Sequence, residues 1–459
     1  MTTLPINRAT TLKAAYQVCN PLRSLEGADL DRYYVDLSDV RKTEAIAGVS
    51  NILDCQEPEQ FTTILFTGHR GCGKSTELKR IQKEWEKDYR VIYLEVNEET
   101  DINDVGYTDF YLIAIKRVEF EMRRLGLKLD SRLMENFEAW FKDVTEETER
   151  SVESSVSLEG EVTLGPEAPF LAKLLVKLLA QIKGSDRQKK TIRQTLEKDI
   201  SRLKADINLL LNDAVKKLRK KFPNYKGFLI IFDNLDRVPP NVANHLFFDY
   251  AAQLQELNCT MIYTVPLGAL YSSQNAVKNF DCPHIIPMVN IYEFNRDICD
   301  LNYNEVNLNA MASLIERRVE VDILFESREQ LLEVAKASGG HVRQLIQIMR
   351  TASITARGRG QDKIMAEDVT YAIKQEQFNF ERLIPQNHYP LLAQVCLTKN
   401  INKDEISELM LFNLSVLEYN GKNRWNYPNP VVKQNEEFQK ALRDAREPNV
   451  NPERSQFTN

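Results

Sequence analysis

The stretch from Gly68 to Ser75, which reads GHRGCGKS, constrains the fold more than any other part of the chain. It matches G-x-x-x-x-G-K-[ST] at every fixed position, which is the pattern of a phosphate-binding loop. Residues 61–67 before it read FTTILFT, a run typical of a short buried strand. Residues 76–87 after it contain neither glycine nor proline and favour a helix. This context favours a phosphate-binding loop over an ordinary glycine turn.

The residue types in this loop predict how it holds a polyphosphate. Glycines let the backbone curl so that N–H groups point inward, and the helix N-terminus adds partial positive charge. We expect Lys74 to contact the β- and γ-phosphates and the Ser75 hydroxyl to bind Mg²⁺. The expected cofactors are therefore ATP and Mg²⁺. The predicted binding residues are Gly68, His69, Arg70, Gly71, Cys72, Gly73, Lys74, Ser75 and Thr76.

A second half of the site is expected on a neighbouring strand, because Mg²⁺ also needs a carboxylate. Residues 228–236 read FLIIFDNLD, an apolar run that ends in acids. Asp233 is the predicted Walker B carboxylate, which binds the metal directly or through water. Asp236 is the candidate that polarises the attacking water, since Asn234 cannot act as a base. The alternative interpretation is a core strand with a capping aspartate.

Three further residues are candidates for the site. Thr264 is the polar residue near the end of an apolar run, 260–265, where its side chain can meet water at the γ-phosphate. Arg343 follows Gly339-Gly340-His341 at a predicted helix start and is a candidate lid residue for the γ-phosphate; the alternative is a surface arginine. Tyr34 is a candidate neighbour of the adenine, or else an ordinary core aromatic.

Length and composition limit the class of protein. A chain of 459 residues is too long for one ordinary core and predicts two or three domains. Its 43% hydrophobic and 27% charged residues are typical of a soluble globular protein, and a net charge of -6 gives no general attraction to nucleic acid. Seven cysteines without a C-x-x-C pair argue against disulfides or zinc and favour the cytoplasm. No segment looks like a signal peptide or membrane span.

An insertion is expected within the nucleotide-binding domain. Lys74 and Asp233 are separated by about 160 residues, more than two or three βα units need. Residues 151–164 alternate apolar and polar around a glycine and predict a hairpin. Residues 168–183 predict an amphipathic helix, and 185–221 predict one long helix with a coiled-coil-like stripe. The basic end of that helix, 216–221, is interpreted as a solvated helix end, with DNA or an acidic partner as the alternative.

The C-terminal part predicts two short helices and a hairpin around Asn420-Gly421. Residues 381–459 contain about ten basic and ten acidic residues, whereas a DNA reader needs a basic face. Trp425 and Tyr427 are therefore interpreted as packing or protein-contact residues. The predicted divisions are an N-terminal segment 1–60, an ATPase core 61–300 with the insertion 131–226, a helical lid 301–380, a winged-helix-like domain 381–447 and a disordered tail 448–459.

Taken in order, the loop 68–75, the strand 228–236, Thr264 and the helix start 339–343 resemble the AAA+ and STAND ATPases. Within that group they resemble the branch related to origin-recognition ATPases, over about residues 30–430 apart from the insertion. The resemblance implies an α/β P-loop NTPase with a parallel five-stranded sheet, a helical lid and often a winged helix. It also implies that Thr264 is sensor 1 and Arg343 is sensor 2.

Two departures from that resemblance bear on turnover. Typical AAA+ proteins follow the Walker B aspartate with glutamate, whereas Asn234 stands here, which looks more like STAND proteins and implies slow or partner-dependent hydrolysis. No arginine occurs from residue 238 to 295, where a trans-acting arginine finger is expected, so a ring with composite sites is less favoured. Arg237, Arg317 and Arg318 are the remaining candidates.

These observations favour an ATP-binding switch that regulates self-association or a partner effector through the insertion and the C-terminal domain. By analogy with STAND proteins, such a switch suggests bacterial signalling or defence, including antiviral defence. The alternative is a DNA-associated AAA+ initiator or loader that uses the winged helix. A P-loop kinase or transferase is disfavoured by the large lid. The sequence does not identify the partner, the trigger or the number of subunits.

Overall fold

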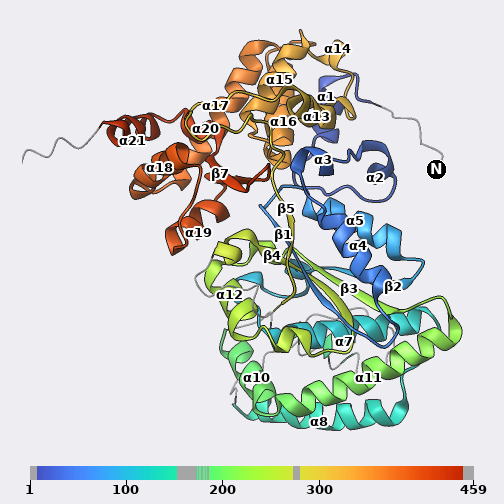
Figure 1. Ribbon diagram of the computed structural model, residues 1–459. Coiled ribbons are helices and arrows are strands. Elements are labelled where there is room, and N and C mark those ends of the chain that lie inside the picture. The colour runs from blue at the N-terminus through green and yellow to red at the C-terminus, as the bar shows by residue number, and fades with distance from the viewer. Residues whose placement is uncertain are drawn as a thin grey trace, which may run out of the picture.

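The computed structural model describes residues 8–151, 173, 175–176, 179–180, 182, 186–271 and 280–447. Its centre is a sheet of five parallel strands in the order β2-β3-β4-β1-β5 (Figure 1). The strands are β1 (Thr63–Gly68), β2 (Tyr89–Glu95), β3 (Gly227–Asp233), β4 (Thr260–Pro266) and β5 (His284–Ile286). The predicted five-stranded parallel sheet is therefore confirmed.

The strands separate two hydrophobic cores because successive side chains point to opposite faces of the sheet. Leu229 and Ile231 of β3 belong to one core, and Phe228, Ile230 and Phe232 to the other. Every residue of β3 is buried, as expected for a central parallel strand. All carboxyl ends lie at one edge of the sheet, which brings the loop after β1 close to the end of β3.

Helices cover both faces. The first core includes α4 (Ala45–Cys55) and α5 (Lys74–Trp85). The second includes α7 (Tyr107–Arg124) and the insertion helices α8 (Ser131–Ser151), α10 (Asp186–Lys198) and α11 (Ile200–Lys221), which lie at the bottom of Figure 1. A short 3₁₀ turn, η2 (Leu235–Arg237), follows β3, and α12 (Pro240–Asn244) precedes β4.

The prediction of one long helix over residues 185–221 is wrong. The chain forms α10 and α11, and Asp199 between them leaves helical geometry with φ -128° and ψ 43°. The two helices have different main partners, since α10 packs against α8 and α11 against α7. The apolar stripe serves the second core and is not a coiled-coil seam. The predicted hairpin at 151–164 and most of the predicted helix at 168–183 lie outside the described residues.

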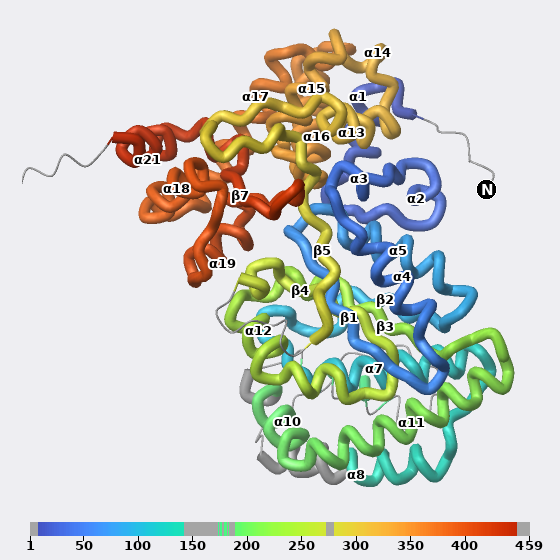
Figure 2. Tube along the Cα trace, in the orientation of Figure 1, coloured from blue at the N-terminus to red at the C-terminus, as the bar shows by residue number. Residues whose placement is uncertain are grey.

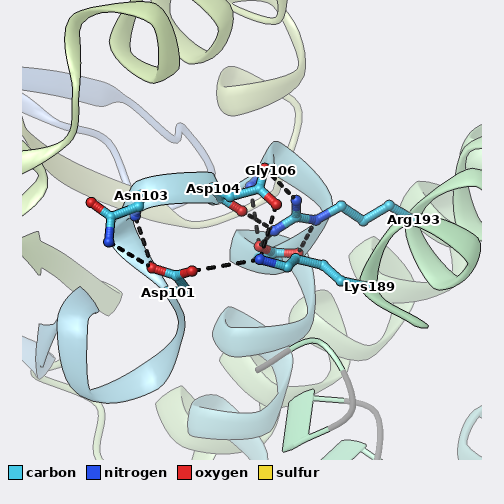
Figure 3. Close-up of polar contacts among 7 residues, drawn as sticks. Asp101, Asn103, Asp104, Gly106, Lys189 and Arg193 are labelled. Atoms are coloured by element: carbon cyan, nitrogen blue, oxygen red, sulfur yellow. Dashed lines mark hydrogen bonds and ion pairs between the residues drawn. The ribbon is translucent and has the colours of Figure 1, made fainter. Parts of the chain in front are cut away.

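A polar cluster fastens the insertion to the segment that follows β2 (Figure 3). This segment comprises α6 (Val96–Glu99) and η1 (Ile102–Asp104). Arg193 of α10 pairs with Asp104 at 3.1 Å and with the fully buried Asp109 at 2.5 Å. Lys189 pairs with Asp104 at 2.9 Å and with Asp101 at 3.5 Å. The insertion is thus anchored close to the carboxyl end of β2.

The lid consists of five helices at the top of Figure 1: α13 (Glu305–Glu316), α14 (Val321–Leu324), α15 (Arg328–Ala337), α16 (Val342–Gly358) and α17 (Ala366–Leu383). The N-terminal helix α1 (Leu12–Val18) packs against α16, and Ala9 forms a parallel bridge with Val319. Ala9 and α1 therefore belong to the lid layer, and the tube in Figure 2 also shows α1 beside α13 and α14. The chain then passes through α2 (Gly27–Tyr33) and α3 (Ser38–Arg41) toward the sheet.

The C-terminal part contains the two expected helices and the expected hairpin. Its elements are α18 (Tyr389–Thr398), α19 (Glu405–Phe412), β6 (Val416–Tyr419), β7 (Trp425–Pro428), α20 (Pro430–Lys433) and α21 (Glu436–Arg446). Every residue of both strands is buried, with Trp425 only 2% and Tyr427 only 1% exposed. Both aromatics are packing residues, which confirms that interpretation. No helix among the described residues is long and apolar enough to cross a bilayer.

Candidate nucleotide site

The loop between β1 and α5 requires its glycines. Gly71 has φ +82°, and a Cβ there would lie 2.6 Å from the Nε2 atom of His341. Gly73, which precedes the helix, has φ +112°. Such values favour glycine because other residues rarely adopt this part of backbone space. The loop is therefore specified by its backbone geometry and also by contact with the lid.

Lys74 is the buried cation of the loop. Its ammonium group donates to the carbonyl oxygens of Gly68 and His69, both at 2.8 Å. It also pairs with the carboxylate of Asp236 at 2.9 Å, and its side chain is only 3% exposed. The loop thus presents one fixed ammonium group next to the cavity that the loop lines.

Asp233 lies at the end of β3 beside Ser75. The Ser75 hydroxyl and the Tyr93 hydroxyl both donate to its carboxylate, and the Asn234 N–H does so at 2.7 Å. Burial and the nearby Asp236 raise the pKa of Asp233, and these hydrogen bonds offset part of that rise.

A divalent cation suits the hydroxyl and carboxylate oxygens of Ser75 and Asp233, which are the hard ligands that Mg²⁺ prefers. Among the described residues, no three acidic, histidine or cysteine side chains form a metal-binding group.

Several arginines surround the same cavity. Its lining includes Arg23, Arg41, Arg237, Arg318 and Arg343 together with loop residues 71–77. Burial, Arg237 and Arg70 lower the pKa of the Arg343 guanidinium, because like charges and desolvation oppose its charged form. The cavity is lined by more basic than acidic side chains, so it carries an excess of positive charge and fits a polyanion.

Arg41 is a residue that the sequence did not single out. It is 3% exposed and donates to the carbonyl of Cys72 in the loop. Only the path of α3 across the cavity brings it there, so no local sequence signal marks it. Arg318, which is 5% exposed, also lines this cavity from the lid.

Tyr34 and Thr264 take different positions. Tyr34 lines the cavity, and its hydroxyl donates to Glu77 at 3.1 Å while Arg80 lies 4.9 Å from its ring. Its contact with the base stays a prediction. The Thr264 hydroxyl is fully buried, accepts from the Leu235 N–H at 2.9 Å and donates to the Phe232 carbonyl at 3.3 Å. It fixes the backbone after β3 and is not part of the cavity lining; its contact with water at the γ-phosphate stays a prediction.

The lid is hydrogen-bonded directly to the loop. The His341 imidazole donates from Nε2 to the Arg70 carbonyl at 2.9 Å, and the Arg343 N–H donates to the Gly71 carbonyl at 3.1 Å. A carbonyl oxygen can only accept, so His341 carries its proton on Nε2. Two successive loop residues are thus held by the start of α16.

The C-terminal hairpin holds the preceding loop residue. The Glu418 N–H of β6 donates to Nε2 of His69 at 2.8 Å, so this histidine carries its proton on Nδ1. The His69 side chain faces the hairpin, which leaves any role in phosphate binding to its backbone. We call the contacts of His69, Arg70 and Gly71 with Glu418, His341 and Arg343 the loop clamp.

The loop clamp predicts acid sensitivity. Burial lowers the pKa of both His69 and His341 to about 3. In the unfolded chain these groups titrate at about 6.5, so between those pKa values the unfolded state binds more protons and stability falls as pH falls. From pH 7.5 to 5.5 each histidine should cost about 1.4 kcal/mol, measured by urea unfolding. His341→Gln, whose amide still donates, should lose about half of the combined effect. Equal pH dependence in both proteins would contradict this.

The fold and the site define the class: this is an α/β P-loop NTPase, with a parallel five-stranded sheet and a phosphate-binding loop at its carboxyl edge. Residues 43–252 match the model of the KAP family P-loop domain. No curated protein matches the sequence.

Solved structures similar over most of the chain include Cdc6p from Pyrobaculum aerophilum, at 12% identity and a TM-score of 0.38, covering 94% of this chain and 98% of that one. The ORC2 protein of Aeropyrum pernix has 10% identity and a TM-score of 0.39, with the same coverage. The RuvB Holliday junction branch migration motor of Thermotoga maritima has 12% identity and a TM-score of 0.34, covering 88% and 95%. At these values the likenesses support no conclusion about activity or partners.

Proposed function

We propose that the protein binds Mg-ATP in the cavity between sheet and lid and hydrolyses it slowly. Lys74 and the loop amides would hold the phosphates, and Arg343 would contact the γ-phosphate from the lid. Ser75 and Asp233 would hold Mg²⁺, which supplies charge neutralisation to the phosphates when bound. Support comes from the buried ammonium group of Lys74 at the loop and from the excess of arginines around the cavity.

We further propose that the nucleotide controls a conformational switch. The observation that carries this proposal is the loop clamp, in which three successive loop residues bond to the lid and to the C-terminal hairpin. A polyphosphate drawn into the loop would alter the backbone that the clamp holds. A ligand shifts a conformational equilibrium only through contacts that differ between the two states. In the proposed switch, the bonds of the loop clamp would supply that difference.

The switch would act on self-association or on a protein effector through the insertion and the C-terminal domain. The defence or signalling role that STAND proteins suggest is an analogy at the level of fold. A DNA-binding role receives less support. Both strands of the hairpin that would form the wing are buried, and only its turn, 421–424, is exposed. At the basic helix end, Lys217 bonds to Asp213, and Arg219 and Lys221 bond to backbone carbonyls within the chain.

The test is steady-state ATP hydrolysis combined with mass measurement by analytical ultracentrifugation. We expect slow Mg²⁺-dependent turnover that changes less than about twofold with duplex DNA at low or moderate salt. Few phosphate contacts imply little counterion release and thus little salt dependence. We also expect the mass or sedimentation coefficient to differ between ADP and ATP, as a switch requires.

Stimulation of turnover by DNA that weakens as salt rises would contradict the switch and support the initiator or loader. Turnover with identical sedimentation in ADP and ATP would contradict the switch. The remaining interpretation would be an ordinary nucleotide-hydrolysing or phosphoryl-transferring enzyme. The Lys83→Ala protein, altered on the outer side of α5 where Lys83 is 54% exposed, serves as the control for nonspecific charge effects.

A further inference from the structure

Glu95 stands beside the predicted metal carboxylate at the edge of the sheet. It is the last residue of β2, as Asp233 is of β3, and the strand register pairs the two. Glu95 is half-buried and lines the same cavity as Lys74 and Asp236. The strand next to β3 therefore supplies a carboxylate to the nucleotide cavity.

Asn234 holds Glu95 in place. It adopts a left-handed backbone conformation with φ 71°, which asparagine tolerates better than most residues. Its side-chain amide donates to Oε2 of Glu95 at 3.0 Å and to Oδ1 of Asn97 at 2.7 Å. Within the described parts of the chain, no lysine or arginine pairs with Glu95. Its hydrogen-bond partner, the Asn234 amide, is neutral.

Asp236 is placed differently. One of its oxygens lies 2.9 Å from the Lys74 ammonium group. That oxygen is therefore occupied by a charged donor. Glu95 has no such competitor, and it has one more methylene group with which to reach into the cavity. As a proton acceptor it is the better placed of the two.

We propose that Glu95 is the catalytic base of ATP hydrolysis, with Asn234 as its positioning residue. This inference rests on the proposed hydrolysis. The water oxygen bonds to the γ-phosphorus while the bond from that phosphorus to the bridging oxygen of ADP breaks. The electron pair of that bond leaves with ADP, and the water proton passes to Glu95, which returns it to solvent. Asp236 instead holds Lys74 at the loop.

The test replaces Glu95 by glutamine, which keeps its size but cannot accept the proton. We expect Glu95→Gln to bind Mg-ATP within about threefold of the native affinity and to lose at least about 100-fold in turnover, the usual contribution of a general base. Asn234→Ala should lower kcat with little change in KM. Glu57→Gln, the same change at an exposed site in the loop before β1, should leave both values unchanged. Binding is measured by calorimetry and folding by thermal melting.

Three results would overturn the inference while leaving the proposed function intact. One is native-like turnover by Glu95→Gln. Another is turnover lost in Asp236→Asn but kept in Glu95→Gln. The third is a Glu95→Gln protein that loses turnover only together with affinity or melting temperature, which would indicate a structural role. Native protein that binds Mg-ATP without any turnover would contradict the proposed hydrolysis itself, and with it this inference.

Discussion

Lys74→Ala is expected to reduce the affinity for Mg-ATP at least about 100-fold, equivalent to about 2.7 kcal/mol of binding free energy. The ammonium group is buried at the phosphate-binding backbone, where it already holds two loop carbonyls. Hydrogen bonds from a charged donor each contribute roughly 1.5–3 kcal/mol, and a polyphosphate offers more than one acceptor. Calorimetric titration measures the loss.

The protein without nucleotide should keep its stability after this change. Asp236 loses its ion pair with Lys74, but Arg343 lies within its electrostatic reach and can take over part of that role. The change also removes one positive charge from a crowded cluster. Melting temperatures should therefore diverge only when Mg-ATP is added, since ligand at about 100 times its Kd stabilises by about 2.7 kcal/mol.

Lys83→Ala is the matched control, because Lys83 lies on the same helix and pairs with Asp31 at the surface. It should bind Mg-ATP like the native protein. If Lys74→Ala bound Mg-ATP as tightly as Lys83→Ala, the cavity would hold phosphate by other groups, and the assignment of the loop would be wrong.

The sequence predicted those parts of the site that depend on residue types at a fixed, short spacing along the chain. The phosphate-binding loop needs glycine, lysine and serine at fixed spacing, so the residues from Gly68 to Ser75 identify it without the fold. Asp233 follows an apolar strand, and parallel strands necessarily bring their ends to one edge. Its place beside Ser75 follows from these two local patterns.

The parts that the sequence did not predict depend on contacts between distant segments. Arg41 reaches the loop only because α3 crosses the cavity. The His69 side chain meets Glu418, a residue 349 positions away, and no periodicity encodes that distance. The break at Asp199 was missed because helices on either side carry the same apolar spacing. Glu95 was missed because a strand-ending glutamate is common, and only the register beside Asp233 gives it meaning.

Gly340→Ala is expected to destabilise the protein more than any other glycine-to-alanine substitution in the lid. Gly340 has φ +79°, and a Cβ there would lie 1.9 Å from the carbonyl oxygen of Val289. Backbone cannot move aside as a flexible side chain does, and the left-handed conformation itself costs alanine about 1–2 kcal/mol. We expect a loss on the order of 3 kcal/mol in unfolding free energy, seen as a lower melting temperature.

The same substitution should weaken Mg-ATP binding, because it acts at the junction between core, lid and hairpin. Val289 donates to the Gly340 carbonyl, and its neighbour Met288 donates to the carbonyl of Glu418. A shift at Gly340 would move His341 and Arg343, and the loop clamp with them.

Gly358→Ala is the control, since nothing lies within 4 Å of its Cβ position at the end of α16, and alanine there should be neutral or stabilise by about 0.5–1 kcal/mol. Native stability combined with native affinity in Gly340→Ala would show that the lid does not depend on this junction. Reduced stability with native affinity for Mg-ATP would show that the packing of the lid does not affect nucleotide binding. That result would contradict the loop clamp as the element that links the two.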